Sequence, residues 1–262
     1  MIRRRPVLRA LAALAATLLL TAGAAVAAEI HVMTSGGFTA AYNELTPLFE
    51  RATGDKVSTA YGASMGGAPD SIPSRLDRGE PADIVILAST ALDDLIRQGK
   101  VVPGSRVDLV RSLIGMSVRK GAPKPDISTV EALKRTLLEA KSVAYSASAS
   151  GTYISTEMFA ALGLADAMKD KAKRIVSERV AAVVARGDAE LGFQQVSELL
   201  PDPGADFVAT LPEPVQRATI FSAGIATASK QPEAARALIA FFVSPEAAPT
   251  IEKTGLEPLT RK

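Results

Sequence analysis

Hydrophobic residues along this chain follow two recurring patterns: short continuous runs, and runs in which they return every three or four positions. The continuous runs predict buried strands, and the spaced runs predict amphipathic helices. The pattern begins with a strand at residues 29–34 and a helix whose apolar face carries Phe38, Tyr42 and Leu45. Residues 83–87 form an almost wholly apolar run of the kind that is buried on both faces of a sheet. This alternation predicts an α/β fold with helices on both faces of its sheets.

The same patterns predict the remaining elements. Further strands are expected at residues 57–60, 113–118, 142–145, 175–176, 191–194, 207–210 and 219–226. Further helices are expected at residues 72–78, 92–98, 130–140, 180–186, 233–242 and 245–254, and one more is expected to carry Tyr153, Met158, Phe159 and Leu162. Strands that alternate with helices pair in parallel, so the predicted sheets are mixed and mostly parallel.

The first residues have the pattern of an export signal. Four arginines occur within the first nine residues, an apolar stretch follows, and no acidic residue occurs before Glu29. Residues 25–27 match the small-x-small pattern of a cleavage site, which predicts a signal peptide over residues 1–27, cleaved after Ala27, and a periplasmic location. An uncleaved anchor is the alternative, but the apolar stretch is shorter than the ~20 residues that span a bilayer. The pair Arg4-Arg5 leaves both the general and the twin-arginine export routes open.

Composition excludes several kinds of chemistry. The sequence has no cysteine, which excludes disulfides and thiol catalysis. Its one histidine is His31, and because a zinc site needs several histidine or cysteine ligands, no metal is expected. No Gly-x-Ser-x-Gly motif accompanies His31, so we interpret it as structural and not as part of a catalytic triad. The formal net charge of +2 becomes negative once the four signal arginines are removed, which gives no support for a nucleic-acid partner.

Three strand-to-helix loops, at residues 34–37, 63–67 and 148–152, combine small hydroxyl residues with glycines. Unpaired N–H groups at the start of a helix attract negative charge, and glycine lets a ligand approach the backbone closely. Loops that leave the carboxyl ends of strands meet at one edge of an open sheet, so the three loops together predict a cradle for a small anion. Each loop alone also fits an ordinary helix cap or turn. No loop has a nucleotide-binding glycine motif, and no organic cofactor is expected.

These loops, together with the segment Gly79-Glu80-Pro81-Ala82-Asp83, resemble the molybdate-type family of periplasmic solute-binding proteins. The similar stretches are residues 29–42, 61–87, 144–164, 185–195 and 223–256. The resemblance implies a two-lobed periplasmic-binding-protein fold of type II, with one lobe at residues 28–113 and 218–262 and the other at residues 114–217. It also implies a hinge between the lobes, closure on a small oxyanion or carboxylate, delivery to an inner-membrane ABC permease, and a monomeric chain.

The resemblance further implies which residues contact the ligand. The implied set is Ser35, Gly36, Gly37, Ser64, Met65, Ser150, Gly151, Ser177 and Gln195. Two positions depart from the family pattern, because Gly37 stands where the first loop has a serine and Gln195 stands where the pocket has a tyrosine. A glutamine amide offers two donors and an acceptor where a phenol offers one hydroxyl. These departures fit a larger, flatter, carboxylate-bearing ligand better than molybdate.

The first two loops also resemble a branch of this family that includes aconitate isomerase, an enzyme that interconverts cis- and trans-aconitate. An allylic proton shift on a tricarboxylate needs a base, an acid and groups that hold the carboxylates. The candidates are Tyr61, Tyr153, Glu157 and Arg75. Tyr153 and Glu157 share a helix face, although core packing of the tyrosine and solvation of the glutamate are their more ordinary roles. Arg75 and Arg78 also fit an ordinary helix surface.

Gln194 and Gln195 end an apolar strand, where two amides indicate a polar role. Strand alternation predicts that only one of them reaches the ligand. The sequence shows donors and loops but no clear proton-transfer set, so a transport receptor is the favoured hypothesis and the isomerase is the alternative. The fold alone does not decide between them, because function depends on the chemistry of the site.

Overall fold

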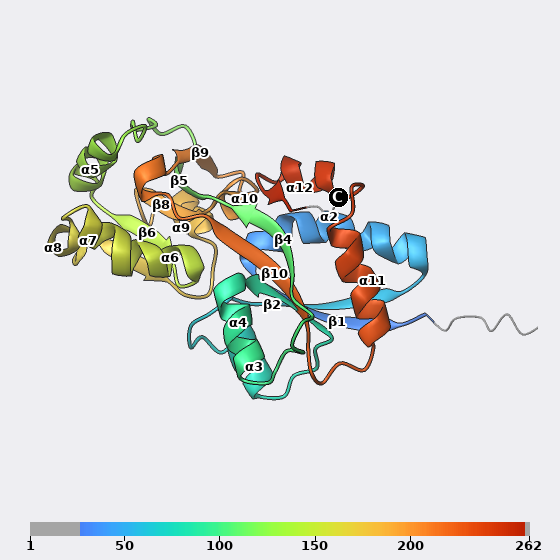
Figure 1. The fold of residues 1–262 in the computed structure, drawn as a ribbon. Helices are drawn as coiled ribbons and strands as arrows, with labels where there is room; N and C mark the ends of the chain where they lie inside the picture. The colour runs from blue at the N-terminus through green and yellow to red at the C-terminus, as the bar shows by residue number, and fades with distance from the viewer. Residues whose placement is uncertain (1–26, 260–262) are drawn as a thin grey trace, which may run out of the picture.

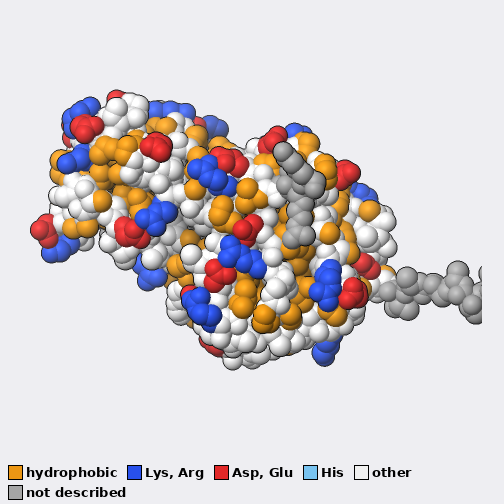
Figure 2. Space-filling view, in the orientation of Figure 1, with side chains coloured by type: hydrophobic (Ala, Val, Ile, Leu, Met, Phe, Trp, Pro, Cys, Tyr) orange, Lys and Arg blue, Asp and Glu red, His pale blue; other side chains and the backbone are white. Residues whose placement is uncertain are grey.

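Two lobes, each built on a mixed β-sheet, make up the protein in the computed structural model, which describes residues 27–259 (Figure 1). Residues 1–26, which carry almost all of the predicted export signal, lie outside the described part. The two sheets with flanking helices confirm the predicted fold class. Figure 2 shows the lobes as two rounded bodies that meet at a narrower waist, with acidic and basic side chains interspersed over both.

The first lobe contains the strands β1 (Glu29–Thr34), β2 (Lys56–Tyr61), β3 (Ile84–Ala88), β4 (Val107–Ser112), β10 (Thr219–Ile225) and β11 (Glu257–Pro258). They form a six-stranded sheet in the order β11-β4-β10-β3-β1-β2. Its helices are α2 (Gly36–Thr53), α3 (Ile72–Asp77), α4 (Ser89–Arg97), α11 (Pro232–Phe242) and α12 (Ala248–Lys253). Strand β1 pairs in parallel with β2 and β3, whereas β10 runs antiparallel to β3 and β4.

Helix α2 buries its apolar face in the core of the first lobe. Phe38 and Tyr42 both contact the ring of Phe242 on α11, with ring centroids 5.4 and 5.8 Å apart, and Leu45 is fully buried on the same face. The helix ends at Gly54, whose left-handed backbone (φ 83°) is the conformation that favours glycine after a helix. The spacing of apolar residues in the sequence therefore predicts this helix and its buried face.

The second lobe contains the strands β5 (Ile114–Arg119), β6 (Val143–Ser146), β7 (Ala172–Ile175), β8 (Leu191–Gln195) and β9 (Ala205–Thr210). They form a five-stranded sheet in the order β7-β6-β8-β5-β9. Its helices are α5 (Val130–Glu139), α6 (Ala149–Tyr153), the π-helical η1 (Ile154–Met158), α7 (Phe159–Ala161), α8 (Ala165–Met168), α9 (Val180–Arg186), α10 (Val196–Leu199) and the 3-10 helix η2 (Glu213–Val215). Strand β6 is parallel to β7 and β8, and β5 is antiparallel to β8 and β9.

The chain crosses between the lobes where β4 leads into β5 and where η2 leads into β10. Gln216 ties these crossings together, because its Oε1 accepts a hydrogen bond from the Ile114 N–H at 3.0 Å and its Nε2 donates to the Ile114 carbonyl at 2.9 Å. The crossing strands β4 and β10 lie side by side and antiparallel (Figure 1). The sequence patterns predict mostly parallel sheets. The crossing strands β4, β5 and β10 pair antiparallel with their neighbours, so the sheets contain more antiparallel pairing than predicted.

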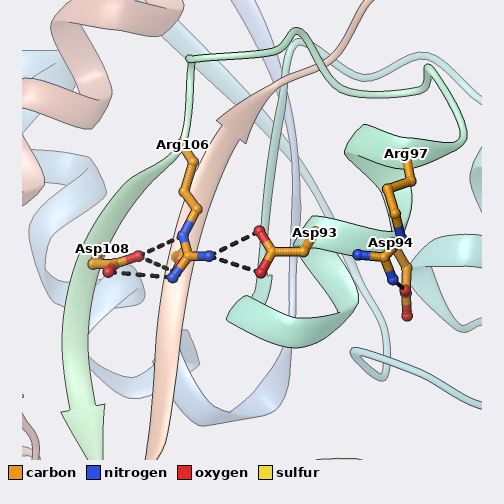
Figure 3. Close-up of polar contacts among 6 residues, drawn as sticks. Asp93, Asp94, Arg97, Arg106 and Asp108 are labelled. Atoms are coloured by element: carbon orange, nitrogen blue, oxygen red, sulfur yellow. Dashed lines mark hydrogen bonds and ion pairs between the residues drawn. The ribbon is translucent and has the colours of Figure 1, made fainter.

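A cluster of ion pairs fastens α4 to β4 in the first lobe (Figure 3). Arg106 Nη1 lies 2.8 Å from both carboxylate oxygens of Asp93, and Arg106 Nε lies 2.8 Å from Asp108 Oδ1. Asp108 also accepts a hydrogen bond from the Ser222 hydroxyl on β10 at 2.7 Å. Because these charges are partly exposed, they orient the elements more than they stabilise the fold.

Several elements differ from the sequence prediction. The pattern does not predict β4, whose Asp108 and Arg111 interrupt the apolar run, or α10, which is shorter than two helical turns. The helix expected around Tyr153 contains a π-helical turn at Ile154–Met158. The helix expected from residue 245 begins at Ala248, because a proline in its first turn suits the start of a helix and not its interior.

His31 lies on β1, and its interpretation as a structural residue stays a prediction. Its backbone N–H donates to Asp83 Oδ2 at 2.8 Å, which joins the two strand beginnings. Among residues 27–259, no group of three or more His, Cys, Asp or Glu side chains could hold a metal ion. Within the same range, no helix has the length and apolar character needed to cross a bilayer.

Candidate functional site

A cavity of about 250 Å³ lies between the two lobes. Its first-lobe wall comes from the start of α2 and residues 61–63 after β2, and its second-lobe wall comes from residues 146–150, residues 175–179, the end of β8 and α10. Pockets for drug-sized ligands begin at roughly 300 Å³. The cavity is therefore suited to a small solute.

Hydrogen bonds join the two lobes beside this cavity. The Ser197 hydroxyl on α10 donates to the carbonyl of Gly37 at 2.7 Å. The backbone N–H of Ser64 donates to the Ser148 hydroxyl at 3.3 Å. The two lobes are thus in contact through these hydrogen bonds.

The start of α2 brings backbone N–H groups to the cavity. Ser35 is its N-cap, but the side chain makes no cap hydrogen bond, and its buried Oγ has no partner among the described residues. Gly36 and Gly37 line the cavity. A β-carbon at Gly37 would overlap the ring of Phe221, and one at Gly36 would overlap the carboxylate of Glu198. Gly36 therefore leaves room for a side chain of the second lobe, and Gly37 leaves room for Phe221 within the first lobe.

The second glycine-rich loop reaches the cavity through residues 61–63. Ser64 is fully buried behind them, and its Oγ accepts a hydrogen bond from the Ala88 N–H at 2.9 Å. Met65 contacts the second lobe, where the Thr152 hydroxyl lies 3.7 Å from its Sδ. Ser64 and Met65 thus lie outside the lining and support the wall from behind.

The third loop places Ser150 on the lining, and Ser177 lines the cavity from the segment before α9. The Ser150 hydroxyl lies 3.1 Å from the Ser146 hydroxyl, so one of the two donates to the other. Gly151 stands behind the lining, and a β-carbon there would overlap the backbone carbonyl of Ser146. Gly151 is therefore needed for the tight turn that carries Ser150 into the cavity.

Gln194 and Gln195 both line the cavity, which corrects the prediction that only one of them reaches it. Gln195 is both the last residue of β8 and the residue before α10, so both side chains lie at the end of the strand that borders the cavity. Gln194 Oε1 accepts a hydrogen bond from the Val180 N–H at 2.9 Å, and its Nε2 donates to Glu198 Oε1 at 2.8 Å. Because a backbone N–H can only donate, these contacts fix the orientation of the Gln194 amide.

The Gln195 amide has an unused hydrogen-bonding group at the cavity. Its Nε2 lies 3.0 Å from the Thr219 hydroxyl, while its buried Oε1 has no partner in the described part of the chain. A hydroxyl can donate as well as accept, so the amide can turn over and keep its contact with Thr219. In that orientation its NH₂ group takes the place of the unpartnered oxygen and offers a donor there.

Glu198 on α10 is a cavity residue that the sequence patterns do not reveal. Burial raises the pKa of its carboxyl from 4.5 to about 7, against the opposing attraction of Arg179 and the hydrogen bond from Gln194. The side chain is nevertheless only partly covered, because one side of it faces the cavity. A cue in the sequence is the spacing of four residues between Gln194 and Glu198, which brings the two together where the strand turns into a helix.

The other candidates for proton transfer lie in different places. Tyr61 lines the cavity, and its hydroxyl donates to Asn43 at 2.8 Å. Tyr153 lies outside the lining, packs against the hydrophobic core of the second lobe and donates to the carbonyl of Val215 at 2.9 Å. Glu157 pairs with Arg217 at 2.7 Å on the surface.

The arginines predicted as alternatives also lie away from the cavity. Arg75 Nη1 lies 2.7 Å from Glu80 Oε2, and Arg78 Nη2 lies 2.6 Å from Glu80 Oε1. This agrees with their expected role on a helix surface. Arg179, at the start of α9, is instead the arginine that lines the cavity in the described structure.

The chain is similar to known proteins over most of its length. The profile of the family described as "Bacterial extracellular solute-binding protein" matches residues 30–257. Aconitate isomerase from a Pseudomonas species is 49% identical over 230 residues, which cover 88% of this chain and 88% of that protein. The molybdate-binding protein of Azotobacter vinelandii is 31% identical over 244 residues, which cover 90% and 92%. The solved structure of the A. vinelandii periplasmic molybdate-binding protein has the same fold, with a TM-score of 0.69 at 20% identity over 89% of this chain and 100% of that one.

Proposed function

This chain belongs to the family of bacterial extracellular solute-binding proteins, and we propose that its lobes close in the periplasm on a small oxyanion or carboxylate for delivery to an ABC permease. The observation that carries the proposal is the cavity between the lobes. Its walls offer helix-start N–H groups at Gly36 and Gly37, the hydroxyls of Ser150 and Ser177, and the amide of Gln195. Groups of this kind bind anions without a metal or a cofactor.

The charges of the lining favour a carboxylic ligand over a fully ionised oxyanion. Asp70, Glu178 and Glu198 line the cavity together with Arg179. An ionised Glu198 would repel a dianion that has no proton to share. A carboxylic ligand can share a proton with Glu198, and its remaining carboxylates can accept from Arg179 and the backbone N–H groups.

Closure follows from the way the lobes are joined. Gln216 and Ile114 connect the two crossings, so bending near residues 113 and 218 would open the cavity as a hinge. A ligand that contacts Gly37 from one lobe and Ser150 from the other would favour the closed arrangement. We expect one chain to be sufficient, since both walls come from the same chain.

A second candidate function is the interconversion of cis- and trans-aconitate. Two observations favour it: the 49% identity to a protein named aconitate isomerase, and a carboxyl group in the cavity whose pKa lies near neutrality. General acid–base catalysis is most efficient when the pKa of the catalytic group lies near the working pH. A transport receptor does not require such a group.

One experiment distinguishes the two functions. Molybdate, sulfate, citrate, cis-aconitate and trans-aconitate are added separately to the purified mature protein, thermal unfolding is measured, and the aconitate samples are analysed by chromatography. A ligand at 100 times its Kd stabilises by about 2.7 kcal/mol, which raises the Tm of a chain of this size by roughly 5–10 °C. Stabilisation without conversion supports the receptor, conversion of one aconitate isomer into the other supports the enzyme, and no shift with any of these anions contradicts the proposed ligand class.

A further inference from the structure

We propose that Glu198 is the catalytic residue that carries a proton between two carbon atoms of an allylic tricarboxylate held between the lobes. This inference rests on the isomerase function proposed above. It assigns the base and the acid of the reaction to one carboxyl group.

The position of Glu198 is the first argument. It belongs to α10 in the second lobe, yet its Oε1 lies where the β-carbon of Gly36 in the first lobe would stand. The carboxyl therefore sits at the junction of the lobes, beside the start of an 18-residue helix. Further closure of the lobes on a ligand would reduce the access of water to this group, which favours proton transfer between the ligand and the carboxyl.

The contacts of Glu198 are the second argument. Gln194 Nε2 donates to Oε1 at 2.8 Å, and the Val180 N–H holds the far end of the same amide at 2.9 Å. This chain of donors fixes one oxygen of the carboxyl. Among the described residues, no hydrogen bond reaches the other oxygen, which remains available to a ligand.

The proton balance requires no further reactant. Glu198 takes a proton from the methylene carbon of aconitate, and the electrons of that C–H bond form a new C=C bond. The electrons of the former double bond move to the carbon at its far end, where they form a C–H bond with the proton that Glu198 returns. The product is again aconitate, in which the methylene carbon and the double-bonded CH carbon have exchanged places. The new double bond can be cis or trans, and no atom or electron is gained or lost.

The surroundings suit a group that both takes and gives a proton. Burial brings the pKa of Glu198 to about 7, where the acid and the carboxylate are both populated near neutral pH. Arg179 on the second-lobe wall partly opposes this rise. The remaining carboxylates of the lining are Asp70 on the first lobe and Glu178 on the second.

The other lining groups are less suitable. Glu178 is exposed, both of its oxygens accept from Arg186, and this pairing holds its pKa below the ordinary value. The Tyr61 hydroxyl is exposed and already donates to Asn43. Glu198 therefore combines a place at the junction of the lobes, a fixed orientation and a proton that can be exchanged.

The test compares Glu198→Gln with the wild type and with Glu157→Gln. Glutamine keeps the size of the side chain but cannot take a proton from carbon, so conversion of cis- to trans-aconitate should fall by about 100- to 10,000-fold. The thermal shift produced by aconitate should remain. Glu157 is the matched control, because it is a surface glutamate outside the cavity, and Glu157→Gln should convert aconitate at the wild-type rate.

A pH profile and a second variant complete the test. The wild-type kcat/KM should fall as the pH drops below about 7, because the base must be ionised, and Glu198→Asp should retain part of the activity and the same descending limb. If Glu198→Gln does not fold, these two measurements decide, and a flat profile overturns the inference.

The possible failures are distinguishable. Conversion by Glu198→Gln at the wild-type rate overturns the role of Glu198 and leaves the isomerase function in place. A wild type that is stabilised by aconitate but converts neither isomer overturns the isomerase function and this inference with it. Equal loss of binding and conversion in Glu198→Gln assigns the residue to binding and also overturns the inference.

Discussion

Substitution of Glu198 by glutamine should remove a pH dependence from the stability of the ligand-free protein. The pKa of this carboxyl is about 7 in the folded protein, and we take its ordinary value of 4.5 for the unfolded chain. A raised pKa means that the folded protein binds the proton more tightly than the unfolded chain does. The stabilisation is therefore fully present below pH 4.5 and is lost as the pH rises through 7.

The size of the effect follows from the shift. One pKa unit corresponds to 1.36 kcal/mol, so a rise from 4.5 to about 7 corresponds to a loss of about 3 kcal/mol between acidic and alkaline pH. The Glu198 side chain is only partly covered, so solvent at the cavity reduces this figure and makes it an upper estimate. In Glu198→Gln the side chain is neutral at every pH, and the same component should be absent.

The assay is denaturant unfolding of the wild type and Glu198→Gln at a series of pH values from 4.5 to 8.5. All other titrating groups are common to both proteins, so the difference between their free energies of unfolding isolates Glu198. We expect this difference to shift by about 1–3 kcal/mol in favour of the variant as the pH rises, with most of the change between pH 4.5 and 7 (roughly one to two tenfold steps in the folding equilibrium). Glu157→Gln serves as the control, since its carboxylate is exposed and paired with Arg217.

A difference between the two proteins that stays constant across this pH range would contradict the raised pKa of Glu198. A constant difference means that the carboxyl titrates at the same pH in the folded and unfolded states, so it would not be enclosed by the lobes. A shift with the opposite sign would mean that Arg179 and the start of α2 outweigh burial. Either result would also weaken the case for Glu198 as a proton carrier at neutral pH.

Two further substitutions test the closure and the stability of the first lobe. Ser197→Ala removes the hydroxyl that donates to the Gly37 carbonyl across the lobes, and it should weaken aconitate binding by about 0.5–1.5 kcal/mol in titration calorimetry while leaving the unfolding midpoint of the ligand-free protein nearly unchanged. In the wild type, the carboxylate oxygens of Asp83 accept hydrogen bonds from the backbone N–H groups of His31 and Lys230. Asp83→Asn places an NH₂ group beside one of these donors, so the free energy of unfolding measured with a denaturant should fall by about 2–3 kcal/mol. Unaltered aconitate affinity in the first case, or unaltered stability in the second, would contradict the role given to that hydrogen bond.

Local patterns in the sequence are sufficient to predict most of the regular elements. The apolar face of α2, with Phe38 and Tyr42, repeats over several turns and is read directly from the spacing. The order of strands in the first-lobe sheet cannot be read from local spacing, because β10 lies between β3 and β4 although it is more than a hundred residues away in the sequence. No local periodicity contains that information, so the sequence predicts the fold class, and the family resemblance supplies the two lobes.

The site is partly predictable for the same reason. Gly36, Gly37, Ser150, Ser177 and Gln195 are expected from the loops and the resemblance, and the structure brings them to one cavity. The residues that could transfer a proton are harder to predict from the sequence, because their surroundings are set by distant parts of the chain. Examples are the pairing of Glu157 with Arg217 and the contact of Tyr153 with Val215, each about sixty residues apart.

The negative charge of an ionised Glu198 has opposite consequences for the two proposed functions. Two unit charges about 5 Å apart at an effective dielectric constant of ~20 repel by about 3 kcal/mol, so an ionised Glu198 opposes the binding of any anion in the same cavity. In a transport receptor that repulsion reduces affinity at alkaline pH and serves no step of capture or release. In an isomerase it strengthens the carboxylate as a base, because the bound anion makes protonation of Glu198 more favourable and the removal of a proton from carbon less costly. An isomerase needs this carboxyl in the cavity, and the glycine at position 36 leaves room for it against the start of α2.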